Sequence, residues 1–224
     1  MSAPVAILVL WLLFAGTHMG LSSLRLRPRL VAAAGERAFL GLYSLVALAI
    51  FTALFWFYVV HRHQGDLLWS TPIGVAGRWA VYALQAVAWT LIAAGLVQPS
   101  PAAMGVPEER RPKEPRGVQR LTRHPVFMGL GLFGALHLVV NGFASDVLFW
   151  AGFPVFALVG SAHQDGRKRV TLGEPYRAWC EATPFLPFTG RETARGLREM
   201  GMLPIAIGVG LAVVFRLLHG PLFH

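Results

Sequence analysis

Residues 39–60 read FLGLYSLVALAIFTALFWFYVV, an uninterrupted apolar run without Asp, Glu, Lys or Arg. A helix needs roughly 20 mostly apolar residues to cross the hydrocarbon core of a bilayer. The run therefore predicts a membrane-spanning helix. The whole chain agrees, because 55% of its 224 residues are hydrophobic and only 14% are charged. Soluble domains carry about 25% charged residues, so the composition excludes an ordinary water-soluble enzyme.

Apolar stretches on both sides of this run predict five further spans. Those at residues 125–141 and 147–162 are short, at the lower limit for crossing a bilayer. The sequence thus predicts an all-α, polytopic membrane helix bundle of about six transmembrane helices, at residues 5–24, 39–60, 79–97, 125–141, 147–162 and 200–218.

Basic residues gather on one side of these spans. Most of the 20 Lys and Arg residues lie in the loops between spans one and two, three and four, and five and six. Arg62, Arg78 and Arg216 are left for the other side. The positive-inside rule makes the three basic loops cytoplasmic and places both termini outside. The net charge of +9 is then explained by topology and anionic membrane lipids, which excludes nucleic acid as a partner.

The two longest loops differ in composition. Residues 98–124 are rich in Pro, Gly and charge, which predicts an irregular cytoplasmic loop. Residues 163–199 mix charge with aromatic residues, which favours a short interfacial helix around 174–181. Cys180 is the single cysteine of the chain, so a disulfide framework and a Cys-rich metal cluster are excluded.

Two histidines are the ionisable residues within the predicted spans that stand out. His18 lies in span one and His137 in span four, whereas every acidic residue lies in a loop or at a span end. Buried ionisable groups in membranes usually face a partner, a cavity or a cofactor. Two neutral nitrogen donors without acids suit haem iron with bis-imidazole ligation. The alternative is that both histidines simply pack between helices.

Depth restricts this pairing. At 1.5 Å per residue, His18 lies about 9 Å and His137 about 18–20 Å from the cytoplasmic ends of their spans. This difference suits a haem that lies nearly flat between the two histidines rather than one that stands upright.

The remaining histidines have weaker indications. His61 and His63 follow span two, where a solvated loop is favoured over an exposed metal contact. His124 precedes Pro125, a typical helix start. His163 is two residues from Asp165, and structural and functional interpretations of it stay open.

Spans one to five resemble the NnrU family of bacterial membrane proteins, whose plant relatives include 15-cis-ζ-carotene isomerases. The resemblance covers roughly residues 5–165. It rests on FAGTHMG around His18, on GERAFLGLYSL at the entry to span two, and on RHPVFMG…LHLVVNG followed by FASDVLF. It implies a haem b protein of the bacterial inner membrane, with metal ligands at His18 and His137 and a further characteristic histidine at His124. It also implies a link to denitrification and redox biology.

After residue 163 the chain resembles isoprenylcysteine carboxyl methyltransferases. The motif Arg123–His124–Pro125 and the segment Gly173–Tyr176 carry this likeness. It implies the alternative cofactor S-adenosylmethionine, held by Arg123, His124, Asp165, Glu174 and Tyr176. Three segments are expected: an NnrU-like membrane domain at 1–165, a cytoplasmic interfacial segment at 166–199, and the sixth span with the C-terminus at 200–224.

These observations predict one haem b inside the bundle, with cytoplasmic Arg120 or Arg123 paired to its propionates, since bidentate donors favour carboxylates. The expected function is redox-gated isomerisation of a lipophilic polyene, or a denitrification-linked role in electron transfer or gas sensing. The alternatives are the methyltransferase and a cofactor-free membrane assembly factor. The sequence leaves the substrate and the oligomeric state open.

Overall fold

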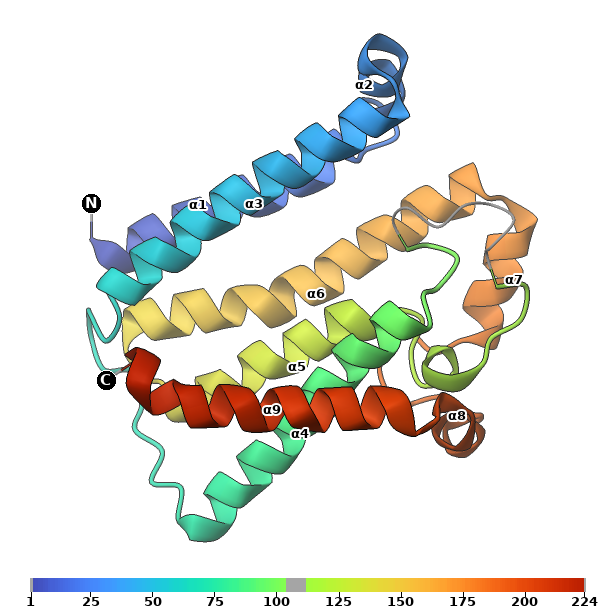
Figure 1. Cartoon of the computed structure of the whole chain (residues 1–224). Helices are drawn as coiled ribbons and strands as arrows, with labels where there is room; N and C mark the ends of the chain where they lie inside the picture. The colour runs from blue at the N-terminus through green and yellow to red at the C-terminus, as the bar shows by residue number, and fades with distance from the viewer. Residues whose placement is uncertain (1, 104–111, 224) are drawn as a thin grey trace. The chain divides into compact units, whose positions relative to one another are not determined.

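The computed structural model describes residues 2–103 and 112–223, with side chains to residue 219. Arg110 and Arg111, which the sequence places in a basic loop, lie outside these residues. The described part is helical and contains no β-strand (Figure 1). Its helices are α1 (Ala3–Leu21), α2 (Arg27–Ala34), α3 (Glu36–Val60), α4 (Val75–Val97), the 3-10 helix η2 (Gly117–Arg120), α5 (Pro125–Val140), α6 (Ala144–Thr171), α7 (Glu174–Ala182), α8 (Thr193–Met200) and α9 (Met202–Phe223).

The predicted all-α membrane architecture is confirmed. The helices α1, α3, α4, α6 and α9 are long and apolar enough to cross a membrane, and α5 is a shorter apolar helix. The predicted length of the fifth span is wrong, because α6 runs for 28 residues and includes the basic segment 163–171 that the sequence places in a loop. Pro154 lies inside α6. The helix continues beyond the apolar run because residues 163–171 contain only one glycine and no proline.

The chain divides into two compact units, which are described separately. Unit 1 contains residues 1–72 and 137–152, and unit 2 contains residues 73–136 and 153–224. Unit 1 therefore holds α1, α2 and α3 with the last turn of α5 and the start of α6. Unit 2 holds α4, α7, α8, α9 and the remainder of α5 and α6. Both predicted metal ligands, His18 and His137, belong to unit 1.

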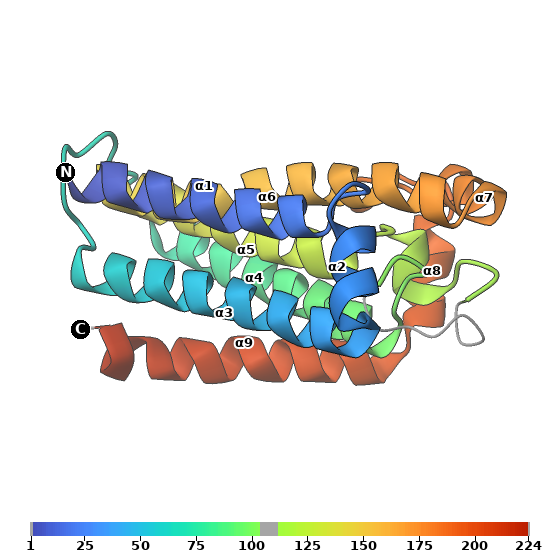
Figure 2. The same cartoon turned by 90° about the horizontal axis from the view of Figure 1, so that it is seen from above.

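Aromatic side chains hold unit 1 together. The helices α1 and α3 lie side by side and antiparallel (Figure 2), so that Trp11 meets Phe51 and His18 meets Tyr43. The Trp11 indole N–H donates to the Phe149 carbonyl over 3.1 Å. This bond joins α1 to the first turns of α6 and satisfies the buried indole.

A network of backbone bonds closes one end of unit 1. The loop after α3 bonds to the turn between α5 and α6 through Leu68 N–H to the Gly142 carbonyl and Ala144 N–H to the Asp66 carbonyl. Gln64 N–H also donates to the Ser145 hydroxyl, and Ser145 N–H donates to the Gln64 carbonyl. Gly142 fits because the Trp69 carbonyl occupies the position that a Cβ would need. These bonds fix where α6 begins.

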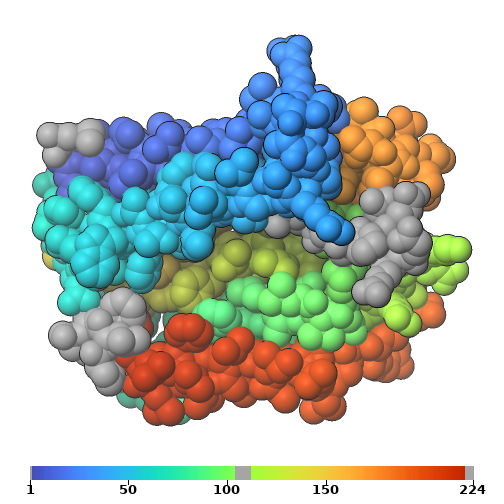
Figure 3. Space-filling model, turned by 45° about the horizontal axis from the view of Figure 1, so that its top comes forward, coloured from blue at the N-terminus to red at the C-terminus, as the bar shows by residue number. Residues whose placement is uncertain are grey.

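Glycines allow the helices of unit 2 to pack closely. Gly129 of α5 approaches the Ala88 carbonyl of α4, and Gly208 of α9 approaches the Thr90 backbone of α4. Small residues are favoured at such contacts in membranes, because van der Waals packing drives association there. The outer face of α9, red in Figure 3, stays largely exposed.

The predicted interfacial helix is present as α7. Its residues Tyr176 and Trp179 are buried and cluster with Ala102. A second cluster joins Val118 of η2, Leu121 and Met200 of α8 to Leu91 of α4. The described residues after α4 therefore form a folded layer rather than only an irregular loop.

The contact between α4 and α9 generates a testable prediction. Gly208→Ala should lower the free energy of unfolding by about 1–3 kcal/mol, because the new methyl group meets the Thr90 backbone. Gly210→Ala is the matched control, since a Cβ there meets nothing within 4 Å. Thermal unfolding in detergent measures both. Equal stability of the two variants would contradict this packing.

Candidate functional site

His18 lies in the last turns of α1, on the face that contacts α3. Its ring centroid is 4.8 Å from that of Tyr43 and 5.5 Å from that of Phe14. The Tyr43 hydroxyl donates to the His18 backbone carbonyl over 3.3 Å. The imidazole is half-buried. Its immediate surroundings in unit 1 are therefore aromatic.

His137 lies in the last turn of α5, and this turn belongs to unit 1. Its ring stacks on Trp150, with centroids 3.9 Å apart and planes 15° from parallel. The Asn141 side-chain amide donates to the His137 carbonyl over 2.8 Å and so caps the end of α5. Trp150 thus fixes the plane of the imidazole from one side.

A continuous series of ring contacts joins the two histidines. Phe14, Trp11, Phe149 and Trp150 lie in that order between His18 and His137, with centroid distances between 3.9 and 6.4 Å. Trp11, Phe14 and His18 are spaced on one face of α1. Trp11 of α1 lies beside Phe149 of α6, to which it is hydrogen-bonded. His18 follows Trp11 by seven residues, so it lies about 10 Å further along the axis of α1 than the position beside Phe149 and Trp150.

These two residues fit a bis-imidazole haem in their chemistry. Such a site needs one imidazole on each side of the iron, and His18 and His137 supply two in the same unit, both half-buried among apolar rings. No group of three or more His, Cys, Asp and Glu side chains able to hold a metal ion is found in residues 2–103 and 112–223.

A second polar site lies in unit 2 and centres on Asp165 of α6. One carboxylate oxygen accepts from His124 Nε2 and from the Tyr176 hydroxyl, each over 2.8 Å. The other accepts from Arg123 Nε, also over 2.8 Å. All four side chains are buried. The site therefore joins the starts of α5 and α7 to α6.

The Arg123 guanidinium is satisfied on its remaining side as well. It donates to the Thr183 carbonyl over 2.8 Å, and it lies 5.1 Å over the ring of Phe185. A buried charge is tolerated when it is paired and hydrogen-bonded in this way. Burial and the Asp165 charge raise the pKa of the Tyr176 hydroxyl, so Tyr176 stays protonated as a donor.

Arg120 is engaged elsewhere in unit 2. It pairs with Glu199 over 2.8 Å and with Glu192 over 3.3 Å. The bond from Arg120, together with the Gly117 N–H, lowers the pKa of the Glu199 carboxyl to about 2. The sequence-predicted pairing of Arg120 or Arg123 with haem propionates stays a prediction, and both guanidiniums already have acidic partners.

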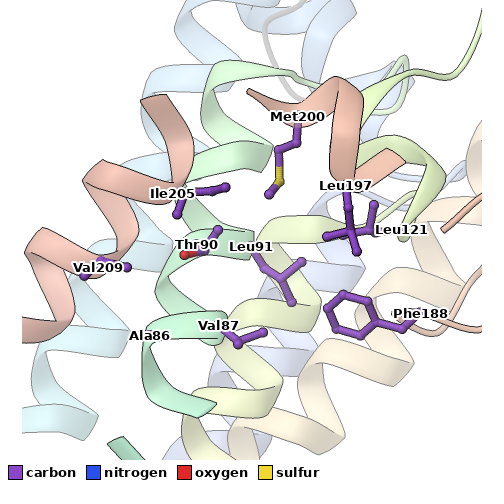
Figure 4. Close-up of a pocket in the computed structure, with 10 residues that line it drawn as sticks. All are labelled: Ala86, Val87, Thr90, Leu91, Leu121, Phe188, Leu197, Met200, Ile205 and Val209. Atoms are coloured by element: carbon purple, nitrogen blue, oxygen red, sulfur yellow. The ribbon is translucent and has the colours of Figure 1, made fainter. Parts of the chain in front are cut away.

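Unit 2 also contains an apolar pocket of about 290 Å³ (Figure 4). Side chains of α4 and α9 line it, and Leu197 and Met200 of α8 close one end. Thr90 supplies the one hydroxyl group of its lining. The pocket contains none of the predicted site residues.

Sequence reasoning missed one pair in unit 1. His63, expected in a solvated loop, places Nδ1 2.7 Å from Asp146 Oδ2. The two residues are 83 positions apart, and no local pattern connects them. The only signals were an acid at the beginning of a span and a histidine at the end of another.

The family match covers nearly the whole chain. Residues 6–224 match the family described as NnrU protein. The chain belongs to the NnrU family. The match extends past residue 165, to the tail whose sequence resembles methyltransferases. No solved structure matches the chain.

Two curated relatives of this NnrU protein are plant enzymes. The chain is 27% identical over 241 residues to the chloroplastic 15-cis-zeta-carotene isomerase of Arabidopsis thaliana, with 100% of this chain and 63% of the relative covered. It is 24% identical over 193 residues to the enzyme of the same name from Zea mays, with 84% and 50% covered. The chain thus spans less than two thirds of the length of these relatives.

The Asp165 site generates a stability prediction. Asp165→Asn should cost about 3–5 kcal/mol of unfolding free energy, because it leaves the buried Arg123 charge without a counter-charge. Tyr176→Phe should cost only about 1 kcal/mol, the typical value of one hydrogen bond. The control is Glu174→Gln, since that carboxylate is exposed and its pair with Arg177 contributes little. The interpretation fails if thermal unfolding shows no difference between Asp165→Asn and Glu174→Gln.

Proposed function

We propose that this NnrU protein is a membrane isomerase that acts on a cis double bond of a lipophilic polyene, with haem b held by His18 and His137. The observation that carries the proposal is the likeness to two isomerases along most of the chain. Two imidazoles within one unit support the cofactor. The apolar spans support a substrate that enters from the bilayer.

The reaction sets modest chemical demands. A cis–trans isomerisation rotates a carbon–carbon double bond and leaves atoms and electrons unchanged overall, so the bond order must fall only transiently. The haem, when bound, supplies one-electron chemistry at its iron for this purpose. A redox-gated reaction of this kind consumes no stoichiometric reductant.

The chain's own residues position the donors and exclude water. Tyr43 holds the backbone of α1 at His18, and Trp150 holds the plane of His137. Trp11 and Phe14 cover the face of α1 between them with apolar rings. Such fixed surroundings keep a ligand or a substrate in one orientation, which is the main contribution of a protein to cofactor chemistry.

The same features support a location in the bacterial inner membrane. Several spans make the protein multi-pass, and the resemblance to bacterial NnrU proteins favours the bacterial inner membrane, although the plant relatives are chloroplastic. A denitrification-linked redox role would use the same haem. The spectroscopic test below examines the haem that both functions require.

The methyltransferase alternative has less support from the geometry. It requires Arg123, His124, Asp165 and Tyr176 to bind S-adenosylmethionine, but these four side chains bond to one another in a buried cluster. Glu174, its fifth candidate, is exposed and pairs with Arg177. We therefore assign the cluster a structural role and do not adopt the alternative.

The cofactor generates the first functional prediction. Protein purified in detergent from cells supplied with iron and haem precursor should show a Soret band, and His18→Ala and His137→Ala should each remove most of it. His61→Ala is the matched control, since its Nδ1 bonds to the Phe57 carbonyl of the same helix. A colourless wild-type protein would contradict the haem and favour a cofactor-free assembly factor.

The proposed isomerase activity generates a second functional prediction. Haem-loaded protein in lipid vesicles should convert 15-cis-ζ-carotene to its trans form at that bond, as separated by chromatography. Each histidine-to-alanine change should reduce the rate to that of empty vesicles. Full activity of haem-free protein would contradict the proposed mechanism while leaving the isomerase activity itself intact.

A further inference from the structure

A His–Asp pair occupies the end of unit 1 where α1 begins. His63 follows α3 and donates from Nδ1 to Asp146 Oδ2 over 2.7 Å, while its backbone N–H donates to Oδ1 over 3.1 Å. Both carboxylate oxygens of Asp146 are thus engaged by one residue. Asp146 lies in the first turn of α6, where the helix dipole stabilises a negative charge.

The two partners differ sharply in exposure. The His63 side chain is 52% exposed, whereas that of Asp146 is 0% exposed. An imidazole whose Nδ1–H is held by a carboxylate keeps Nε2 as its free proton acceptor. The His63 ring is therefore accessible to the surrounding medium, and the buried Asp146 holds it in one orientation.

The backbone at His63 supports a specific arrangement. Its φ is +58°, a left-handed conformation that is uncommon for residues other than glycine. Such strain persists where neighbouring contacts over-determine it. Here the next residue, Gln64, makes two hydrogen bonds to Ser145: its N–H donates to the Ser145 hydroxyl, and its carbonyl accepts from the Ser145 N–H. These bonds hold the loop so that His63 stays against Asp146.

Tyr58 and Trp150 connect the Asp146 side of unit 1 to His137. The charge of the Asp146 carboxylate acts on the Tyr58 hydroxyl, which accepts the Trp150 indole N–H over 3.0 Å. Tyr58 is itself held flat against Phe149, with ring centroids 3.9 Å apart. Trp150 then stacks on His137. A contiguous path thus runs from the exposed imidazole to the ring beneath His137.

We propose that His63 is the proton-exchange site of unit 1 and that Asp146, Tyr58 and Trp150 transmit its protonation state to His137. The species that His63 binds and releases in this proposal is a proton. When His63 gains a proton from the medium, the net charge of the His63–Asp146 pair changes, and the Tyr58 hydroxyl responds because the charge of Asp146 acts on it. The Trp150 N–H, and with it the ring stacked on His137, responds because it donates to that hydroxyl.

Two other charged residues, Arg62 and Asp66, flank His63 in its loop. Arg62 precedes His63 in the loop and lies close enough to act on Tyr58, and Asp66 contributes its carbonyl to the α6 start. From α6 the facing acid is Asp146. His61 stacks on Phe57 of its own helix, with centroids 4.0 Å apart, and it provides a neighbouring histidine outside the path.

The path can be tested without any cofactor. Imidazoles change charge between pH 5 and 8. The tryptophan fluorescence intensity of the wild type, measured across this range, should therefore contain a pH-dependent component. Trp150→Phe, His63→Gln and Tyr58→Phe should each abolish that component. His61→Gln should retain it. Circular dichroism checks that the variants are folded, and Asp146→Asn provides a second interruption that preserves side-chain size.

Each outcome decides the proposal. Loss of the component in the path variants alone supports it. A component that survives in His63→Gln or Tyr58→Phe, or its absence from the wild type, overturns it. None of these outcomes depends on haem, so failure here leaves the proposed function standing.

A second measurement rests on the proposed function. In haem-loaded protein, the midpoint potential should fall with rising pH by up to about 59 mV per unit, the value for one proton per electron. His63→Gln should flatten this dependence, and His61→Gln should not. An unchanged slope in His63→Gln would contradict the coupling while leaving haem binding intact. A protein without haem would instead contradict the proposed function.

Discussion

The bond from the Trp11 indole to the Phe149 carbonyl sets the geometry on which the rest of unit 1 depends. It fixes the register of α1 against α6. Along α1, His18 follows Trp11 by two turns. Along α6, the next residue is Trp150, which stacks on His137. One tertiary contact thus decides at which depths both imidazoles lie.

The two units differ in what their polar groups do. In unit 2, Asp165 is saturated by Arg123, His124 and Tyr176, all of them buried. This closed arrangement joins three helices. In unit 1, the carboxylate of Asp146 is equally buried, but its histidine partner is half-exposed. The first site is suited to stability and the second to exchange with the surroundings.

Much of the fold was predictable because membrane helices are a matter of local composition. The run at residues 39–60 and the interfacial helix at 174–181 correspond closely to α3 and α7. The length of α6 was not predictable from hydropathy, because its last turns are polar and are held by Asp165 and its partners. Local sequence carries no record of such tertiary bonds.

The candidate sites show the same limit. His18 and His137 could be selected because an ionisable residue in an apolar span is conspicuous by itself. The pairing of His63 with Asp146 could not, since the residues are 83 positions apart and meet only when the α3 loop bonds to the α5–α6 turn. Similarly, the Arg123–His124–Pro125 motif indicated a cofactor site, and only the position of Asp165 explains it as a structural cluster.

The central claim is that two imidazoles of unit 1 bind one iron. Pulsed electron paramagnetic resonance of the oxidised protein tests it most directly. The account predicts a low-spin ferric signal coupled to two imidazole nitrogens, one of which disappears when His18 is replaced and the other when His137 is replaced. A high-spin signal alone, or a coupling pattern that neither replacement alters, would contradict it.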